Sequence, residues 1–361
     1  VAFVAGRGDL AGTAGATDIT VTTPSGASTG GTTSTSVSPV LVAITPTPAS
    51  TGGEPSAADA IEADVATFGA GARAAIVVLP WDELPSGEAP ALKKRLAFYA
   101  AHDRRALVNR AVVDRLADRR PAPIAGAAWN APATFDLLHK ALDTVFDAGG
   151  DAIRFVTFGR DVDLYLAAHP AERGAFVAFA KEACSYARGH SGAAADLGAG
   201  VAFSPAALKS EPSFAELLDA QDIVAFSYFP GLGTYEADAT SGVVTTISGL
   251  ADAALGRPIV LQAAGAPSDA LAGGGEATQQ AFFATLFGAI GAHRSSFALA
   301  SVTELHDAPA ASCAAWVASQ GEPPDGPFAA YACSLGVLHA DGLPKPAWSA
   351  VIAGAAALSS P

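Results

Sequence analysis

Residues 258–268 read Pro-Ile-Val-Leu-Gln-Ala-Ala-Gly-Ala-Pro-Ser, and this stretch decides how the rest of the chain is interpreted. The short apolar run follows a helical pattern and ends at Gly265 and Pro267. A buried parallel strand has this composition where it leaves a sheet for a loop, because both of its faces are covered and its residues need not alternate. The stretch therefore predicts a parallel strand of an α/β protein.

The same pairing of a strand with a helix recurs along the chain from Val37 onward. We expect strands at residues 38–45, 73–79, 105–113, 152–158, 198–203, 222–228, 258–262 and 297–305. Helices are expected at residues 57–68, 89–102, 132–148, 171–188, 213–220, 242–254, 277–293 and 347–358. This alternation predicts a single (β/α)8 TIM barrel. An open doubly wound sheet would carry a Gly-rich phosphate loop after its first strand, and Thr45-Pro46-Thr47-Pro48 stands there instead.

Residues 1–36 differ from the rest of the chain. One short strand pattern at residues 18–23 is followed by residues 24–36, which are almost wholly Ser, Thr, Gly and Pro. Such a segment buries too little apolar surface to offset the entropy lost on ordering. We therefore predict an extended N-terminal arm or linker over residues 1–36 and the barrel over residues 37–361. The arm is expected either to pack on its own barrel or to mediate self-association by adding a strand to a neighbouring copy.

The composition excludes several classes of partner. A formal net charge of −14 argues against nucleic acid and against an anionic membrane surface. No stretch is long and apolar enough to span a bilayer. The chain begins at Val1 and contains no Met, so we expect its N-terminus to be either processed or incomplete. A removed export signal is the simplest explanation, and it predicts a protein that is secreted to the extracellular space or the cell surface.

The Cys and His residues give two further expectations. Cys313 and Cys333 lie in one loop-rich region and are expected to form a disulfide in an oxidising compartment. Cys184 falls in a helical pattern and is expected to be a buried, small apolar residue. No His residues have metal-binding spacing and no phosphate-binding loop occurs, so we predict neither a metal nor a cofactor.

Two strand ends resemble the catalytic motifs of secreted (β/α)8-barrel glycoside hydrolases of the retaining type, such as β-glucanases and galactanases. Residues 258–268 are similar to Pro-Ile-Val-Ile-Thr-Glu-x-Gly-x-Pro-Ser, in which the Glu is the nucleophile. Residues 159–163, Gly-Arg-Asp-Val-Asp, are similar to Gly-Asn-Glu-Val-Asp, in which the Glu is the acid/base. Ala263 and Asp161 stand at the two Glu positions. The resemblance extends over residues 37–351 and implies the fold, although a fold does not by itself fix an activity.

The two replacements argue against the chemistry that the resemblance implies. Retaining hydrolysis needs two carboxyl groups about 5–5.5 Å apart, and Ala263 has none. Asp161 is one methylene shorter than Glu, and a misplacement of roughly 1 Å can cost about a hundredfold in rate. We expect Arg160 to pair with a nearby carboxylate and to lower its pKa, the wrong direction for a general acid. Our leading interpretation is a pseudoenzyme that serves as a structural or assembly subunit, or as a glycan-binding module, at the cell surface.

Glu304 and Asp307 follow the last predicted strand and leave an alternative open. An active hydrolase of β-linked polysaccharide would use Asp161 with one of them as an inverting pair, about 6.5–9.5 Å apart. The structural alternative is that Asp307 caps a loop and Glu304 pairs with an Arg. Whether the chain is an enzyme therefore stays open, with the balance towards no activity.

The C-terminal ends of the barrel strands also supply candidates for glycan binding. These are Trp81, Asp82, Trp129, Arg160 and Tyr228. Aromatic faces stack on sugar rings, whereas the alternative for each ring is packing between a loop and the barrel. Trp316 and Trp348 are interpreted as structural residues.

Overall fold

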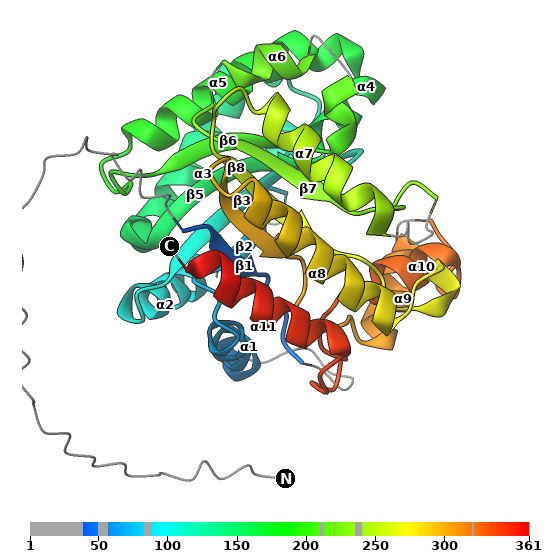
Figure 1. Cartoon of the computed structure of the whole chain (residues 1–361). Helices are drawn as coiled ribbons and strands as arrows, with labels where there is room; N and C mark the ends of the chain where they lie inside the picture. Colours follow the sequence, from blue (N-terminus) through cyan, green and yellow to red (C-terminus); the bar gives the residue numbers. More distant parts are fainter. Residues whose placement is uncertain are drawn as a thin grey trace, which may run out of the picture. The chain divides into compact units, whose positions relative to one another are not determined.

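The computed structural model describes residues 39–49, 57–82, 88–209, 213–219, 221–234, 240–319 and 321–360. The predicted arm at residues 1–36 lies outside these ranges, so its placement and any self-association stay predictions. Within the described residues, the chain forms a closed parallel barrel surrounded by helices (Figure 1). The predicted TIM barrel is confirmed.

The barrel strands follow one another around the barrel in chain order. They are β1 (Leu41–Ile44), β2 (Ala74–Pro80), β3 (Arg105–Asp114), β5 (Ile153–Arg160), β6 (Gly198–Phe203), β7 (Val224–Tyr228), β8 (Ile259–Ala264) and β9 (Phe297–Val302). Each pairs in parallel with the next, and β9 closes the barrel on β1 with Leu299 opposite Leu41. The two-residue strand β4 (Ala117–Asp118) is an addition: it folds back antiparallel on the end of β3.

The helices cover the outside of the barrel (Figure 1). Those matching predicted helices are α1 (Ala57–Gly69), α2 (Glu88–Ala101), α3 (Pro132–Gly149), α5 (Arg173–Gly189), α6 (Ser213–Leu218), α7 (Val243–Ala253), α8 (Glu276–Ala292) and α11 (Pro346–Ser359). The sequence did not predict α4 (Val162–Ala168), α9 (Ala310–Ser319) and α10 (Pro327–Ala332). The last two correct the expectation of a loop-rich region around the cysteines, where helices this short show no sustained apolar period.

The core has two layers. A small cluster that includes Ile76, Leu107 and Phe155 fills the inside of the barrel, and a much larger cluster packs the strands against the helices. Above the apolar interior lies a polar layer. Thr157 Oγ1 donates to Gln262 Oε1 at 2.6 Å, and the amides of Gln262 and Asn109 both donate to Gly159 O, at 3.2 and 3.1 Å. These bonds tie β3, β5 and β8 together beneath the C-terminal mouth of the barrel.

Gly159 turns the chain at the end of β5. Its φ is 79°, and a Cβ there would lie 2.7 Å from Val162 Cγ2 and 2.9 Å from Val113 Cγ2. Only glycine combines a positive φ with the absence of a Cβ, so the turn from β5 into α4 depends on this residue. The next two residues, Arg160 and Asp161, are thereby presented at the mouth of the barrel.

The disulfide prediction is confirmed. Cys313 in α9 is bonded to Cys333 just after α10, with their Cα atoms 6.0 Å apart. Cys184 is fully buried in α5, also as predicted. No helix among the described residues has the length and apolar character needed to cross a bilayer.

Candidate functional site

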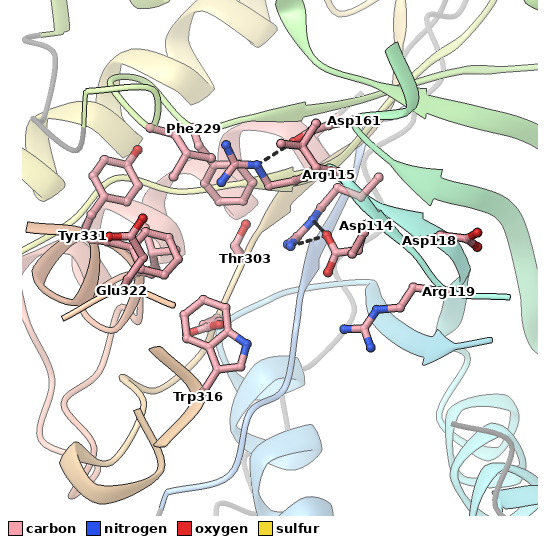
Figure 2. Close-up of a pocket in the computed structure, with 18 of the residues that line it drawn as sticks. Asp114, Arg115, Asp118, Arg119, Asp161, Phe229, Thr303, Trp316, Glu322 and Tyr331 are labelled. Atoms are coloured by element: carbon pink, nitrogen blue, oxygen red, sulfur yellow. Dashed lines mark hydrogen bonds and ion pairs between the residues drawn. The ribbon is translucent and has the colours of Figure 1, made fainter. Parts of the chain in front are cut away.

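A pocket of about 660 Å³ opens at the C-terminal ends of β3, β5 and β9 (Figure 2). One wall consists of charged residues from the β3–β4 hairpin and the end of β5. The opposite wall comes from the segment between Cys313 and Cys333 and includes Trp316, Glu322 and Tyr331. The pocket thus lies where a TIM barrel places its functional site.

Asp161 is the most deeply buried acid of the pocket. Its side chain is only 5% exposed, and its Oδ2 lies 4.0 Å from Arg115 Nε. Its Oδ1 makes no hydrogen bond of good geometry among the described residues, although the Ser227 hydroxyl lies near enough to favour the ionised form. Burial raises the pKa of Asp161 from the ordinary 3.8 to about 6, although the charge of Arg160 opposes this shift. A carboxyl with such a pKa exchanges a proton readily near neutral pH.

Arg160 pairs with a carboxylate at the mouth of the barrel. Its guanidinium binds Asp114, with Nε at 2.7 Å and Nη2 at 2.6 Å from Asp114 Oδ1. The expectation that Arg160 pairs with a carboxylate is confirmed. Arg160 also lowers the pKa of Asp161, as expected, but loss of hydration outweighs this attraction and the net shift is upward.

Glu304 lines the same pocket from the segment after β9. Burial, followed by the charge of Asp307, raises the pKa of Glu304 to about 8. No ion pair to its carboxylate is found among the described residues, so the predicted pairing of Glu304 with an Arg does not occur there. Glu304 and Asp161 are thus two perturbed carboxyl groups facing one cavity.

Asp307 has a structural role instead. Lys345 Nζ lies 2.7 Å from Asp307 Oδ1 and 2.6 Å from Oδ2, and the Gly336 amide donates to Oδ1 at 3.0 Å. Asp307 is also absent from the lining of the pocket that holds Asp161. These contacts agree with the prediction that Asp307 caps a loop. They do not support Asp307 as a relocated catalytic group.

The nucleophile position carries no carboxyl group at the pocket. Ala263 lies in β8, is 9% exposed and pairs with Ser227 of β7. Its neighbour Gln262 points into the barrel, where it binds Thr157 and Gly159. Neither residue lines the pocket, and no other residue of β8 does.

The aromatic candidates are buried rather than exposed. Trp81 and Trp129 are both 0% exposed and stack on each other with ring centroids 6.3 Å apart. Tyr228 is 6% exposed and packs on Phe282. These rings therefore follow the packing alternative. Asp82 does line the pocket, where it accepts a hydrogen bond from Arg119 Nη1 at 3.0 Å.

The pocket uses residues that sequence reasoning assigned elsewhere or did not mention. Trp316, interpreted as structural, is 43% exposed and lines the pocket, which corrects that interpretation. Trp348, in α11, packs against the large core cluster as expected. Arg115, Phe229, Glu322 and Tyr331 were not singled out. The one usable signal was the cysteine pair, because a disulfide after the last strand of a barrel fixes a loop next to its mouth.

The site shows no metal centre. Across the ranges that the structure describes, no group of three or more His, Cys, Asp and Glu side chains is arranged to hold an ion. The residues that remain for chemistry are two carboxyl groups with raised pKa values, three Arg side chains and an aromatic wall.

Comparisons with known proteins support the fold. No protein-family model and no curated protein matches the sequence. A GH5 subfamily 18 variant from Bifidobacterium longum, solved with Manβ1-4GlcNAc, is similar in structure at a TM-score of 0.64 and 17% identity, over 88% of this chain and 78% of that one. The exo-β-1,4-mannosidase of Opitutaceae bacterium strain TAV5 gives a TM-score of 0.66 and 15% identity, over 89% and 60%.

A third similar structure, from work on two fungal β-1,4-galactanases, gives a TM-score of 0.56 and 11% identity, over 79% of this chain and 89% of that one. All three neighbours are glycoside hydrolases by name or family. At these identities the likeness shows a common barrel and no more, which agrees with the resemblance noted in the sequence.

Proposed function

We propose that this protein is a glycoside-hydrolase-like barrel that binds a glycan at the mouth of its barrel and has lost retaining hydrolysis. The observation that carries the proposal is the combination of a pocket of about 660 Å³ with Ala263 at the nucleophile position. The retaining mechanism requires an attacking carboxylate at the position that Ala263 occupies, and a methyl group cannot supply it.

The pocket retains features that suit a sugar. Trp316 presents a large, partly exposed indole ring, and acidic side chains around it can accept hydrogen bonds from hydroxyl groups. Pockets with aromatic walls and a few converging polar groups are typical of small-ligand sites. The three structural neighbours act on or bind β-linked glycans by their names, which makes β-1,4-linked oligosaccharides the first ligands to test.

Calorimetric titration of the protein with β-1,4-linked gluco-, manno- and galacto-oligosaccharides tests the proposal. We expect binding of at least one series without release of reducing sugar. Trp316→Ala should weaken that binding at least tenfold, whereas Ile61→Ala, at an exposed position of α1, should not change it. Sustained release of reducing sugar by the wild-type protein would contradict the loss of activity.

A second function is favoured by the raised pKa values of Asp161 and Glu304. Between pH about 6 and about 8, Asp161 is ionised while Glu304 remains protonated. One neutral acid and one carboxylate in the same pocket are the two groups that inverting hydrolysis uses, with Glu304 as general acid and Asp161 as the base for water. This candidate predicts a bell-shaped pH profile of kcat/KM between those values and a product of inverted anomeric configuration, detected by proton NMR.

We further propose that the protein is exported, because the Cys313–Cys333 disulfide suits an oxidising compartment. An assembly role through residues 1–36 stays a separate prediction. Light scattering of the full chain and of a chain lacking those residues tests it: a loss of self-association on truncation supports the role, and identical masses oppose it.

A further inference from the structure

The charged residues of the pocket are acidic in excess. Six carboxylates and three guanidinium groups line it. Each guanidinium already faces a carboxylate: Arg119 lies 3.0 Å from Asp82, Arg160 lies 2.6 Å from Asp114, and Arg115 lies 4.0 Å from Asp161. An anionic ligand would therefore have to break an existing pair. Asp118 is also paired, with Arg120, and Glu304 keeps its proton up to a pH of about 8, so a cationic ligand meets one ionised carboxylate of the six that has no counter-ion among the described residues.

Glu322 is that carboxylate. Its side chain has no ion pair or hydrogen bond among the described residues, and its main-chain amide donates to Val317 O at 3.3 Å. That bond holds Glu322 close to the end of α9, the helix that carries Trp316, and Figure 2 shows the Glu322 side chain beside Tyr331 on the side of the pocket where Trp316 also lies. A carboxylate and aromatic rings that line the same pocket attract a protonated amine, the carboxylate through its charge and the rings through their faces.

Asp161 supplies a second acceptor across the pocket. It is 3% exposed, and its Oδ1 makes no hydrogen bond of good geometry in the described part of the chain. A buried acceptor left without a donor is destabilising, so a ligand that brings an N–H or O–H to this oxygen removes that cost. The site therefore favours ligands rich in donors.

We propose that the glycan bound in this pocket carries free amino groups, as a β-1,4-linked glucosamine oligomer does, and that Glu322 and Asp161 receive its ammonium groups. The inference rests on the glycan-binding function proposed above. An ammonium group brings three donors and a positive charge to an acid-lined site, whereas acetylation removes the charge. A polyuronate would be repelled both by the pocket and by the net charge of −14.

The test is calorimetric titration with four hexasaccharides near neutral pH, where Asp161 is ionised and can hold a bound amine in its protonated form. These are the hexamers of glucosamine, N-acetylglucosamine, glucose and galacturonate, the first three β-1,4-linked. We expect the glucosamine hexamer to bind at least about tenfold more tightly than the acetylated and neutral hexamers, with a preference that weakens in high salt. The galacturonate hexamer should show no binding.

Matched variants assign the preference to the pocket. Glu322→Gln should lower affinity for the glucosamine hexamer about tenfold and leave the neutral hexamers unchanged, because it removes the charge and keeps the shape. Asp325→Asn, three residues further on at an exposed position outside this pocket, should change neither.

The outcomes separate the inference from the function on which it rests. Equal affinity for the amino, acetylated and neutral hexamers, or tighter binding of galacturonate, overturns the amino-sugar preference and leaves glycan binding standing. An amino preference that survives in Glu322→Gln overturns the assignment to this residue. Binding of none of the four hexamers or of the neutral oligosaccharides above overturns both proposals.

Discussion

Asp161 Oδ2 lies 4.0 Å from the Nε of Arg115, and both residues have left-handed backbone conformations, with φ values of 51° and 57°. A residue other than glycine held in such a conformation costs of order 1–3 kcal/mol, so each needs support from its surroundings. Asp161 leads from β5 into α4, and Arg115 is at the tip of the β3–β4 hairpin. Two strained turns thus place opposite charges face to face at the mouth of the barrel.

Replacement of Asp161 by Asn should stabilise the folded protein at neutral pH. The pKa of Asp161 is raised from 3.8 to about 6, so in this window the folded protein holds a proton that the unfolded chain has released. The free energy of unfolding of the wild type therefore falls as pH rises through the window, by up to about 3 kcal/mol. Asp161→Asn should lack this fall, as measured by urea unfolding at a series of pH values.

An exposed carboxylate serves as the control for this experiment. Asp252→Asn, on the surface of α7, should keep the pH dependence of the wild type. If Asp161→Asn were less stable than the wild type at neutral pH, the attraction between Asp161 and Arg115 would have to exceed the cost of burying the charge.

The ion pair between Arg160 and Asp114 should control the proton affinity of Asp161. Asp114 accepts the Arg160 guanidinium at 2.6 Å, which satisfies much of that charge. In Asp114→Asn the guanidinium loses this partner, and the pKa of Asp161 should fall below about 6.

Arg160→Gln should shift the pKa of Asp161 upward, because the cation that favours its ionised form is gone. Carbon-13 NMR titration of the Asp carboxyl groups measures both shifts, and shifts in the same direction would contradict the coupling.

Loss of the disulfide should weaken the protein and its pocket together. The bond between Cys313 and Cys333 closes a segment with a sequence separation of 20 residues, a loop for which about 2–4 kcal/mol of stabilisation is typical. The same segment carries Trp316, Glu322 and Tyr331 of the pocket wall. Cys313→Ser with Cys333→Ser should therefore lower both Tm and glycan affinity. A thiol reductant should reproduce the effect in the wild type and add nothing in the double variant.

The pair formed by Lys345 and Asp307 should be essential for stability rather than for binding. Lys345 is 2% exposed, and its ammonium binds Asp307, Ser268 Oγ at 2.8 Å and Gly336 O at 2.8 Å. Lys345→Met leaves the Asp307 charge without its partner and should cost about 3–5 kcal/mol, measured by chemical unfolding. Lys140→Met, at an exposed position of α3, is the control and should cost less than about 0.5 kcal/mol. A small loss in Lys345→Met that is matched by reduced glycan affinity would place the pair in the binding site instead.

Only part of the candidate site could be predicted from the sequence. Strand ends identified Asp82, Arg160, Asp161 and Glu304, because a barrel brings the C-terminal ends of its strands to one face. Trp81 and Trp129 were candidates for glycan binding but are buried, whereas Trp316 was interpreted as structural and faces the pocket. Exposure of a ring depends on which helices pack over it, and this information is not local in sequence.

The sequence by itself determined the barrel, its strands and the cysteine pair. Strand and helix periods are local, and a chain of alternating buried strands and amphipathic helices has few ways to cover every strand. It also determined that position 263 carries a methyl group, whatever the packing around it. Only the tertiary structure decided that Asp161 and Glu304 share a pocket and that both have raised pKa values, because a pKa depends on the water and charges that surround the folded group.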